Sequence, residues 1–170
     1  MTKKIERNYL EINSLTELNS STVSSDDYLV KLINPADFEI NKFFYKNIGK
    51  KHHWVDRLSW TNEQWIKYTS DEKLKTYVLQ KNNDLAGYFE LISHTEINEV
   101  EIAYLGLLEE YQNKKLGSYL LSSAIKNSFL NDPKRVWVHT CSLDHKNALN
   151  NYISRGMAIF KSEILKTKIA

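Results

Sequence analysis

The chain has 170 residues, of which 42% are hydrophobic and 26% are charged, proportions typical of one ordinary globular domain. Its formal net charge is only +2 and its basic residues alternate with acidic ones, which argues against a long nucleic acid as partner. The single cysteine, Cys141, excludes an internal disulfide and a cysteine-built metal cage, and no apolar stretch is long enough to span a bilayer.

The first ten residues carry charges without the apolar segment that a secretory signal needs, so we expect a cytoplasmic protein. We expect one domain over residues 1–170, with an N-terminal arm at 1–27 and a core at 28–165. His52 and His53 are adjacent, and no metal-binding spacing accompanies them, so no metal is expected.

The first part of the chain is predicted to alternate strands with two helices. Asn34 and Pro35 are expected to open the first helix, Asn62 to cap the second, and Leu32, Phe38, Phe43 and Phe44 to face the core. The predicted elements are a strand at 5–12, a helical turn opened by Ser14, a polar connection at 19–27, a strand at 28–33, a helix to about Gly49, an aromatic and charged connection at 50–61, and a helix to Thr69.

The second part is predicted to begin with a hairpin. Two strand-like runs, 74–80 and 85–93, are joined by residues whose Asn and Asp content suits a tight turn. Apolar residues at helical spacing from Leu116 to Phe129 predict an amphipathic helix. The other elements are a strand at 98–108, a strand at 135–140, a helix at 147–155 closed by Gly156, and a strand at 157–165.

The stretch between the strand ending at Leu108 and the helix beginning at Leu116 is suited to bind an anion. N–H groups in the first turn of a helix have no internal partners and carry the positive end of the helix dipole. Lys114 and Lys115 add positive charge there. A solvated turn, with both lysines facing water, is the alternative reading of this segment.

In this stretch the chain resembles the GNAT superfamily of N-acetyltransferases, whose pyrophosphate loop reads [QR]-x-x-G-x-[GA]. Gln112 and Gly117 match its ends, while Lys115 stands where the family usually has glycine. The resemblance implies an α+β GNAT fold: a mixed, mostly antiparallel sheet, splayed between two neighbouring parallel strands and flanked by helices. It also implies that acetyl-CoA is held by the loop residues Gln112, Asn113, Lys114, Lys115, Leu116, Gly117 and Ser118.

A second block, from Asn147 to Met157, is similar to the family segment N-x-A-x-x-x-Y-x-x-x-G-F shortened by one residue. The resemblance implies that Asn147 touches the pantetheine arm of the cofactor and that Tyr152 lies beside its sulfur. Tyr152 is therefore the candidate general acid for the departing thiolate. Without the resemblance, a tyrosine on an amphipathic helix is more often a core residue.

Acetyl transfer also needs a base, because an ammonium group has no lone pair with which to attack. The resemblance implies a glutamate near Glu101, with Glu99 and a water relayed through His139 as competing choices. It further implies that main-chain groups of Leu105, Leu107 and Leu108 meet the cofactor. Gly106 would then permit a bulge or a close backbone approach where the strands splay, or merely a bend at the strand end.

The acceptor is expected to be the primary amine of a small molecule or peptide, and a homodimer stays open as the assembly. Candidate acceptor-site residues are Trp54, Asp56, Trp60, Tyr104 and His139, although structural packing explains the aromatic ones nearly as well. A catalytically weak acyl-CoA-binding or regulatory module is the alternative function. Cys141 as a nucleophile lacks an orienting acid, and no nucleotide-binding glycine motif is present.

Overall fold

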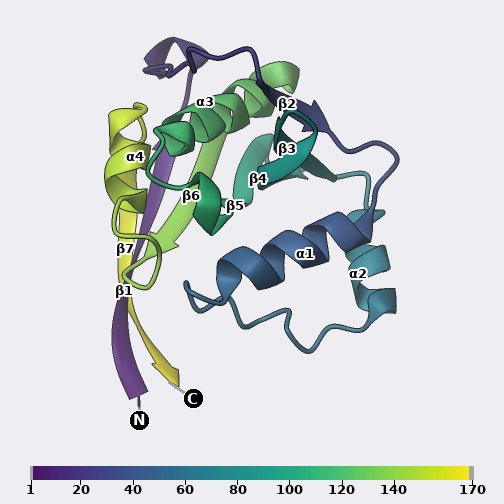
Figure 1. Ribbon diagram of the computed structural model, residues 1–170. Coiled ribbons are helices and arrows are strands. Elements are labelled where there is room, and N and C mark those ends of the chain that lie inside the picture. Colours follow the sequence, from purple (N-terminus) through teal and green to yellow (C-terminus); the bar gives the residue numbers. More distant parts are fainter. Residues whose placement is uncertain (1, 169–170) are drawn as a thin grey trace.

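A seven-stranded mixed sheet, with helices on both faces, forms the body of the computed structural model, which describes residues 2–168 (Figure 1). The strand order is β2-β3-β4-β5-β6-β1-β7. The strands are β1 (Thr2–Ile12), β2 (Tyr28–Leu32), β3 (Leu74–Lys81), β4 (Asp84–His94), β5 (Glu99–Leu107), β6 (Arg135–Cys141) and β7 (Ala158–Lys168). The α-helices are α1 (Phe38–Gly49), α2 (Asn62–Thr69), α3 (Leu116–Ser128) and α4 (Ala148–Ser154), with short 3-10 turns at Leu15–Glu17, Glu109–Tyr111 and Phe129–Asn131.

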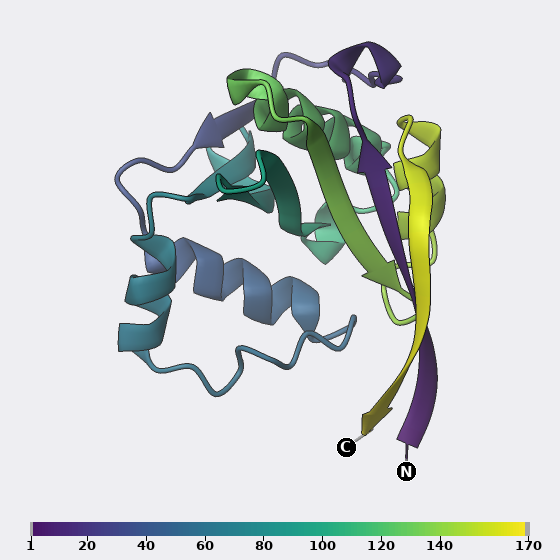
Figure 2. The same cartoon turned by 180° about the vertical axis from the view of Figure 1, so that it is seen from behind.

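The helices cover opposite faces of the sheet (Figures 1 and 2). Because side chains alternate along a strand, Val78 and Tyr88 face α1, whereas Leu79 and Phe89 face α3. The larger of the two cores lies under α3, where four residues of the apolar stripe predicted from the sequence are fully buried, Leu120, Leu121, Ala124 and Ile125, while Phe129 is partly buried. Within the described residues, no helix combines the length and hydrophobicity that crossing a bilayer requires.

The sheet divides between β5 and β6, its one parallel pair. These strands pair only from Glu99–Arg135 to Glu101–Trp137, and no ladder joins them beyond that point. On its other side β5 contains a bulge, because Glu90 is opposite Tyr104 while Leu91 is opposite Ile102. The divergence confirms the mixed, splayed sheet that was expected and leaves facing edges of β5 and β6 unpaired.

Strand β1 lies inside the sheet, between β6 and β7. Leu10 and Ile12 are fully buried, so this strand belongs to the hydrophobic core, although it lies in the segment interpreted from sequence as an arm. Periodicity predicts a strand at this position, but strand partners more than a hundred residues away cannot be read from local alternation.

Several local predictions are confirmed, and some helix starts are displaced. The hairpin turns through Asn82 and Asn83, both with positive φ, and Gly156 has φ +108°. Helix α1 begins three residues later than Pro35, because Asp37 accepts the amide of Glu39. Helix α2 is capped by Thr61 in a capping box with Gln64, not by Asn62.

The prediction that a residue faces the core is wrong for two of the residues named. Leu32 is 38% exposed because it lies on the short edge strand β2, and Phe43 is 42% exposed on the outer side of α1. Phe44 is fully buried, as predicted, and its ring stacks on Tyr88 at 4.7 Å.

Candidate active site

A cleft of about 950 Å³ opens where β5 and β6 diverge. It brings together residues from β1, the α1–α2 connection, β5, the start of α3, β6 and α4. The predicted site residues that line it are Trp54, Asp56, Glu101, Tyr104, Leu105, Leu107, Gln112, Asn113, Lys115, Leu116, Gly117, Ser118, His139, Asn147 and Tyr152. Three other predicted residues, Trp60, Leu108 and Lys114, are not among its lining residues.

The turn before α3 presents free backbone amides to this cleft. Lys115 is the N-cap of α3, adopts a left-handed conformation with φ 61°, and makes no side-chain capping hydrogen bond. Asn113 is also left-handed, with φ 60°. A left-handed conformation is costly for lysine, whereas asparagine adopts it more readily. The uncapped amides at the positive end of the helix can bind a diphosphate.

Gly117 and Asn151 join this turn to α4. The Asn151 side-chain amide donates to the Gly117 carbonyl at 3.1 Å, while its Oδ1 is buried without a hydrogen-bond partner among residues 2–168. A Cβ placed on Gly117 would meet its nearest heavy atoms at 3.7 Å and beyond, so a methyl group fits there at ordinary contact distance. Polar residues of α4 and its C-cap that the sequence analysis did not single out also line the cleft: Asn150, Asn151, Ser154 and Arg155.

The edge of β5 is available to pair with an extended ligand. The amide of Leu108 donates to Ala86 of β4 at 2.9 Å, and successive backbone groups of a strand point to opposite sides. The amides of Leu107 and Leu105 therefore point toward the unpaired side, where β6 has diverged. Leu108 itself is buried, and its side chain packs against the α1 side of the sheet.

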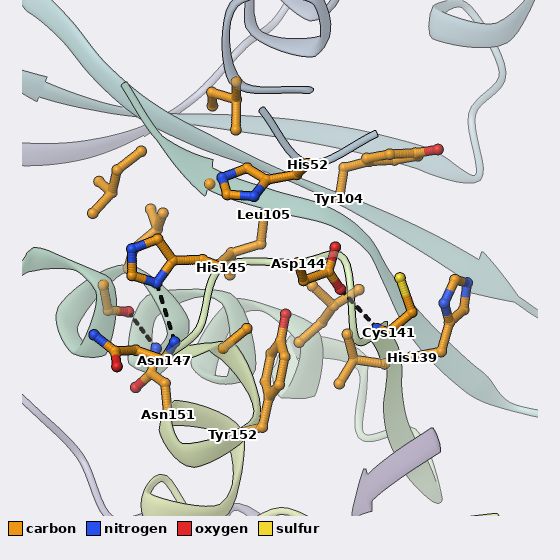
Figure 3. A pocket seen from close by; sticks show the side chains of 18 of the residues that line it. His52, Tyr104, Leu105, His139, Cys141, Asp144, His145, Asn147, Asn151 and Tyr152 are labelled. Carbon is orange, nitrogen blue, oxygen red and sulfur yellow. Dashed lines mark hydrogen bonds between the residues drawn. The ribbon is translucent and has the colours of Figure 1, made fainter. Parts of the chain in front are cut away.

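Tyr152 extends from α4 into the cleft, with its hydroxyl end directed toward the strand that carries Tyr104 and Leu105 (Figure 3). Burial, with a further contribution from the negative charge of Asp144, raises the pKa of Tyr152 well above its usual range. The phenol is therefore protonated at neutral pH and able to donate. Asp144 is fixed by the Thr140 hydroxyl at 2.5 Å and the Cys141 amide at 2.9 Å.

Glu101 lies in the cleft, and a histidine that the sequence analysis did not single out holds its carboxylate. His94 of β4 places Nε2 3.0 Å from Glu101 Oε1, and its ring stacks on Trp137 at 5.9 Å. The competing base, Glu99, is buried and paired with Arg135 at 3.0 Å. Its carboxylate is therefore engaged away from the cleft, which favours Glu101.

His139 and Cys141 line the β6 side of the cleft. Burial and the nearby Arg7 lower the pKa of His139, so this imidazole is neutral at physiological pH. Burial raises the pKa of the Cys141 thiol, which disfavours the thiolate that covalent catalysis needs.

Two further histidines lie on the opposite side of the cleft, where the α1–α2 connection meets the segment before α4 (Figure 3). The rings of His52 and His145 are 6.0 Å apart, and the Asn147 amide donates to His145 Nδ1 at 3.1 Å. Burial, together with the neighbouring His145, lowers the pKa of His52, although Asp144 acts in the opposite direction.

An aromatic wall closes the cleft on the side of α1. Trp54 packs edge-on against Tyr104, with ring centroids 4.8 Å apart. Gly106 allows α1 to lie close to β5, because a Cβ at that position would meet the Ile48 side chain at 2.8 Å. The β5 bulge falls at Ala103 rather than at Gly106, and the close neighbour of Gly106 is the Ile48 side chain of α1.

A buried ion pair anchors this wall. Arg57 pairs with the fully buried Glu90 at 3.1 Å, and Tyr68 donates to the same carboxylate at 2.6 Å. The guanidinium lies over several aromatic rings, including Tyr104 at 4.3 Å and Trp60 at 4.9 Å. Trp60 thus packs on Arg57 behind the cleft, while Trp54 and Asp56 of the same connection reach it.

Comparison with known proteins bears on what this cleft does. The Acetyltransferase (GNAT) family matches residues 38–157, while no curated protein matches the chain. Among solved structures, a GCN5-related N-acetyltransferase from Kribbella flavida is similar, with 12% identity and a TM-score of 0.66 over 97% of this chain and 58% of that one. Another from Sphaerobacter thermophilus has 13% identity and a TM-score of 0.72 over 95% of this chain and 50% of that one.

A third structure is an aminoglycoside acetyltransferase from an uncultured soil metagenomic sample in complex with trehalose. It has 15% identity and a TM-score of 0.64, covering 77% of this chain and 88% of that one. Identities this low indicate the fold alone. The chain spans only about half to three fifths of the length of the Kribbella and Sphaerobacter proteins. The family match, however, extends over most of the chain, which therefore belongs to the GNAT acetyltransferase family.

Proposed function

We propose that this protein transfers the acetyl group of acetyl-CoA directly to a primary amine of a small molecule or peptide. The observation that carries the proposal is the arrangement of the cleft. Free amides at the start of α3 lie at one part of it, the unpaired edge of β5 lies along it, and Tyr152 and Glu101 both reach into it. An anion site, a strand edge and two proton-transfer groups are what this reaction requires.

When bound, acetyl-CoA supplies a thioester whose carbonyl carbon is open to attack. Its diphosphate would lie on the amides of the Gln112–Gly117 turn, and its pantetheine arm against the β5 edge and Asn147. Lys115 fits this arrangement, because its left-handed backbone directs the turn as a glycine would and its side chain is exposed.

Glu101 removes a proton from the acceptor ammonium, giving the neutral amine that forms the new C–N bond. The Leu107 amide donates to the thioester oxygen as negative charge develops there, and the C–S bond breaks. Tyr152 gives its proton to the departing sulfur. No covalent enzyme intermediate is needed, which agrees with the raised pKa of Cys141.

The proposal is tested by measuring binding and turnover separately. Acetyl-CoA should bind with a negative heat-capacity change in calorimetry, and a chemically diverse amine panel should contain acceptors that release free CoA. Binding of acetyl-CoA without CoA release from any amine would contradict the enzyme and favour a binding or regulatory module. A rise in melting temperature with free nucleotides but not with acetyl-CoA would contradict both.

Replacing Tyr152 by phenylalanine should reduce kcat by about 100-fold or more, because the leaving thiolate loses its proton donor. Acetyl-CoA affinity should stay unchanged, since the ring remains in place. Steady-state kinetics and calorimetric titration of the variant measure the two effects. Unchanged turnover would remove Tyr152 from the mechanism.

His94→Ala should lower kcat by about tenfold, because Glu101 loses a hydrogen bond to its charged carboxylate. His94→Gln retains a donor and should lose less. In a Glu101→Gln background, His94→Ala should have no further effect, whereas a purely structural role of His94 would lower activity in both backgrounds. Rate measurements on the four combinations decide between the two.

A further inference from the structure

Strand β1 contributes a basic residue to the part of the cleft that carries Glu101 and His139. Its odd-numbered side chains point away from the α3 core, and two of them, Ile5 and Arg7, line the cleft. Arg7 is opposite Cys141 of β6 on one side and Glu163 of β7 on the other. The side chain is thus on the face of the sheet that also carries His139 and Glu101.

The guanidinium of Arg7 is incompletely used by the protein. Its nearest carboxylate oxygen, Glu163 Oε1, is 3.8 Å from NH1, and that oxygen already accepts from the Tyr9 hydroxyl at 2.7 Å. Within residues 2–168 the buried Nε of Arg7 has no hydrogen-bond partner. A guanidinium carries five N–H donors, so Arg7 retains donors for another anion.

Two other arginines of the region pair more closely with carboxylates. Arg57, which also lines the cleft, pairs with Glu90 at 3.1 Å and donates to Tyr68 at 2.8 Å. Arg135 is held between Glu11 at 3.2 Å and Glu99 at 3.0 Å. Of these three, Arg7 has the least compensated charge. Arg155, the C-cap of α4, also lines the cleft with a buried Nε that has no partner within residues 2–168, but Arg7 is the one on the β-sheet face that carries Glu101 and His139.

His139 is close enough to both Arg7 and Glu101 for its pKa to respond to each charge. Burial lowers the pKa of this imidazole most, Arg7 lowers it further, and Glu101 raises it, so both charged groups act on His139. The acceptor side of the cleft thus has a carboxylate for an amine and, beyond a neutral imidazole, a guanidinium. This pairing of charges is complementary to a molecule that carries both an ammonium and a carboxylate.

We propose that the acceptor bears a carboxylate that pairs with Arg7 while its amine faces Glu101. The inference rests on the proposed function and names its substrate class, amino-carboxylic acids, either free or as the end of a peptide. Guanidinium groups bind carboxylates through two parallel hydrogen bonds, which gives direction as well as charge.

The strand register also limits the length of the acceptor. Glu101 is opposite Trp137, and Arg7 is opposite Cys141, four residues further along β6. Strands β5 and β1 lie on either side of β6, so two inter-strand spacings of about 4.8 Å separate them. Together with four residues of about 3.3 Å each along the strand, this places the Cα atoms of Glu101 and Arg7 about 16 Å apart. This exceeds what the two side chains span together, so the amine and the carboxylate of the acceptor are several bonds apart.

Matched acceptors test the inference. We would measure kcat/KM by CoA release for 6-aminohexanoate and 6-aminohexanamide, which differ in the carboxylate alone, and for glycylglycine and glycylglycinamide as the peptide pair. The wild-type protein should prefer at least one acid over its amide by about tenfold or more. Arg7→Gln should abolish that preference without changing acetyl-CoA affinity, and Arg7→Lys should retain part of it.

Lys4→Gln is the charge-matched control, because Lys4 is exposed on the same strand and does not line the cleft. It should leave the acid-to-amide ratio unchanged. Equal ratios in wild type and Arg7→Gln, or a preference for the amides, would overturn the inference while leaving the proposed function intact. Calorimetric binding of the product 6-acetamidohexanoate, lost in Arg7→Gln, supplies a readout independent of turnover. If no amine is acetylated, the proposed function fails. Equal binding of 6-acetamidohexanoate to the wild type and to Arg7→Gln would contradict the inference independently of turnover.

Discussion

Glu101→Gln should lower kcat by about 10² to 10⁴ at neutral pH, the range that a positioned general base contributes. Glutamine keeps the size of the side chain and can still contact His94, so the fold should persist. The loss should shrink as pH rises, because a growing fraction of the acceptor is already neutral and needs no base. Rate profiles of both proteins across the titration range of the amine provide the measurement.

Glu110→Gln is a suitable control for that experiment. Glu110 is exposed in the 3-10 turn after β5 and does not line the cleft, so the same loss of charge should leave the rate unchanged. A loss in Glu101→Gln that is uniform across pH would indicate positioning of the acceptor rather than proton removal. No loss at all would exclude Glu101 as the base.

Gly117→Trp should abolish detectable acetyl-CoA binding. Gly117 lies in the first turn of α3 and lines the cleft, and an indole there would fill the place proposed for the diphosphate. Thermal unfolding offers a simple measurement: acetyl-CoA at about 100 times its Kd should stabilise the wild type by about 2.7 kcal/mol and the variant not at all.

Gly117→Ala separates the loss of space from damage to the helix. A Cβ at this position meets its nearest neighbour, Asn151 Nδ2, at 3.7 Å, an ordinary contact distance. Alanine also has a higher helix propensity than glycine. The alanine variant should therefore be at least as stable as the wild type and should still bind acetyl-CoA. Retained binding in Gly117→Trp would argue against this position as the diphosphate site.

The sequence predicted the features of the fold that depend on local pattern. The amphipathic stripe of α3, the Asn82–Asn83 turn and the left-handed Gly156 follow from periodicity and backbone preference, and the structure has them. Local pattern does not fix the helix starts, because Asp37 and Thr61 compete with nearby cap candidates of similar chemistry. The place of β1 depends on pairing with β6 and β7, which no local pattern encodes.

In the candidate site, too, local sequence motifs reveal some residues, whereas tertiary contacts alone bring the others together. The loop at Gln112–Gly117 and Tyr152 belong to continuous motifs, so the sequence could point to them. Arg7 and His94 are single residues in ordinary strands, and only the tertiary arrangement brings them to His139 and Glu101. Trp60 was singled out with Trp54, but the Arg57–Glu90 pair, which directs one ring behind the cleft, could not be read from spacing.

A crystal structure of the protein with acetyl-CoA tests the central claim most directly. The account predicts the diphosphate on the backbone amides of the Gln112–Gly117 turn and the Tyr152 hydroxyl within hydrogen-bonding distance of the cofactor sulfur. Acetyl-CoA bound elsewhere with this turn empty, or a sulfur remote from Tyr152, would contradict it.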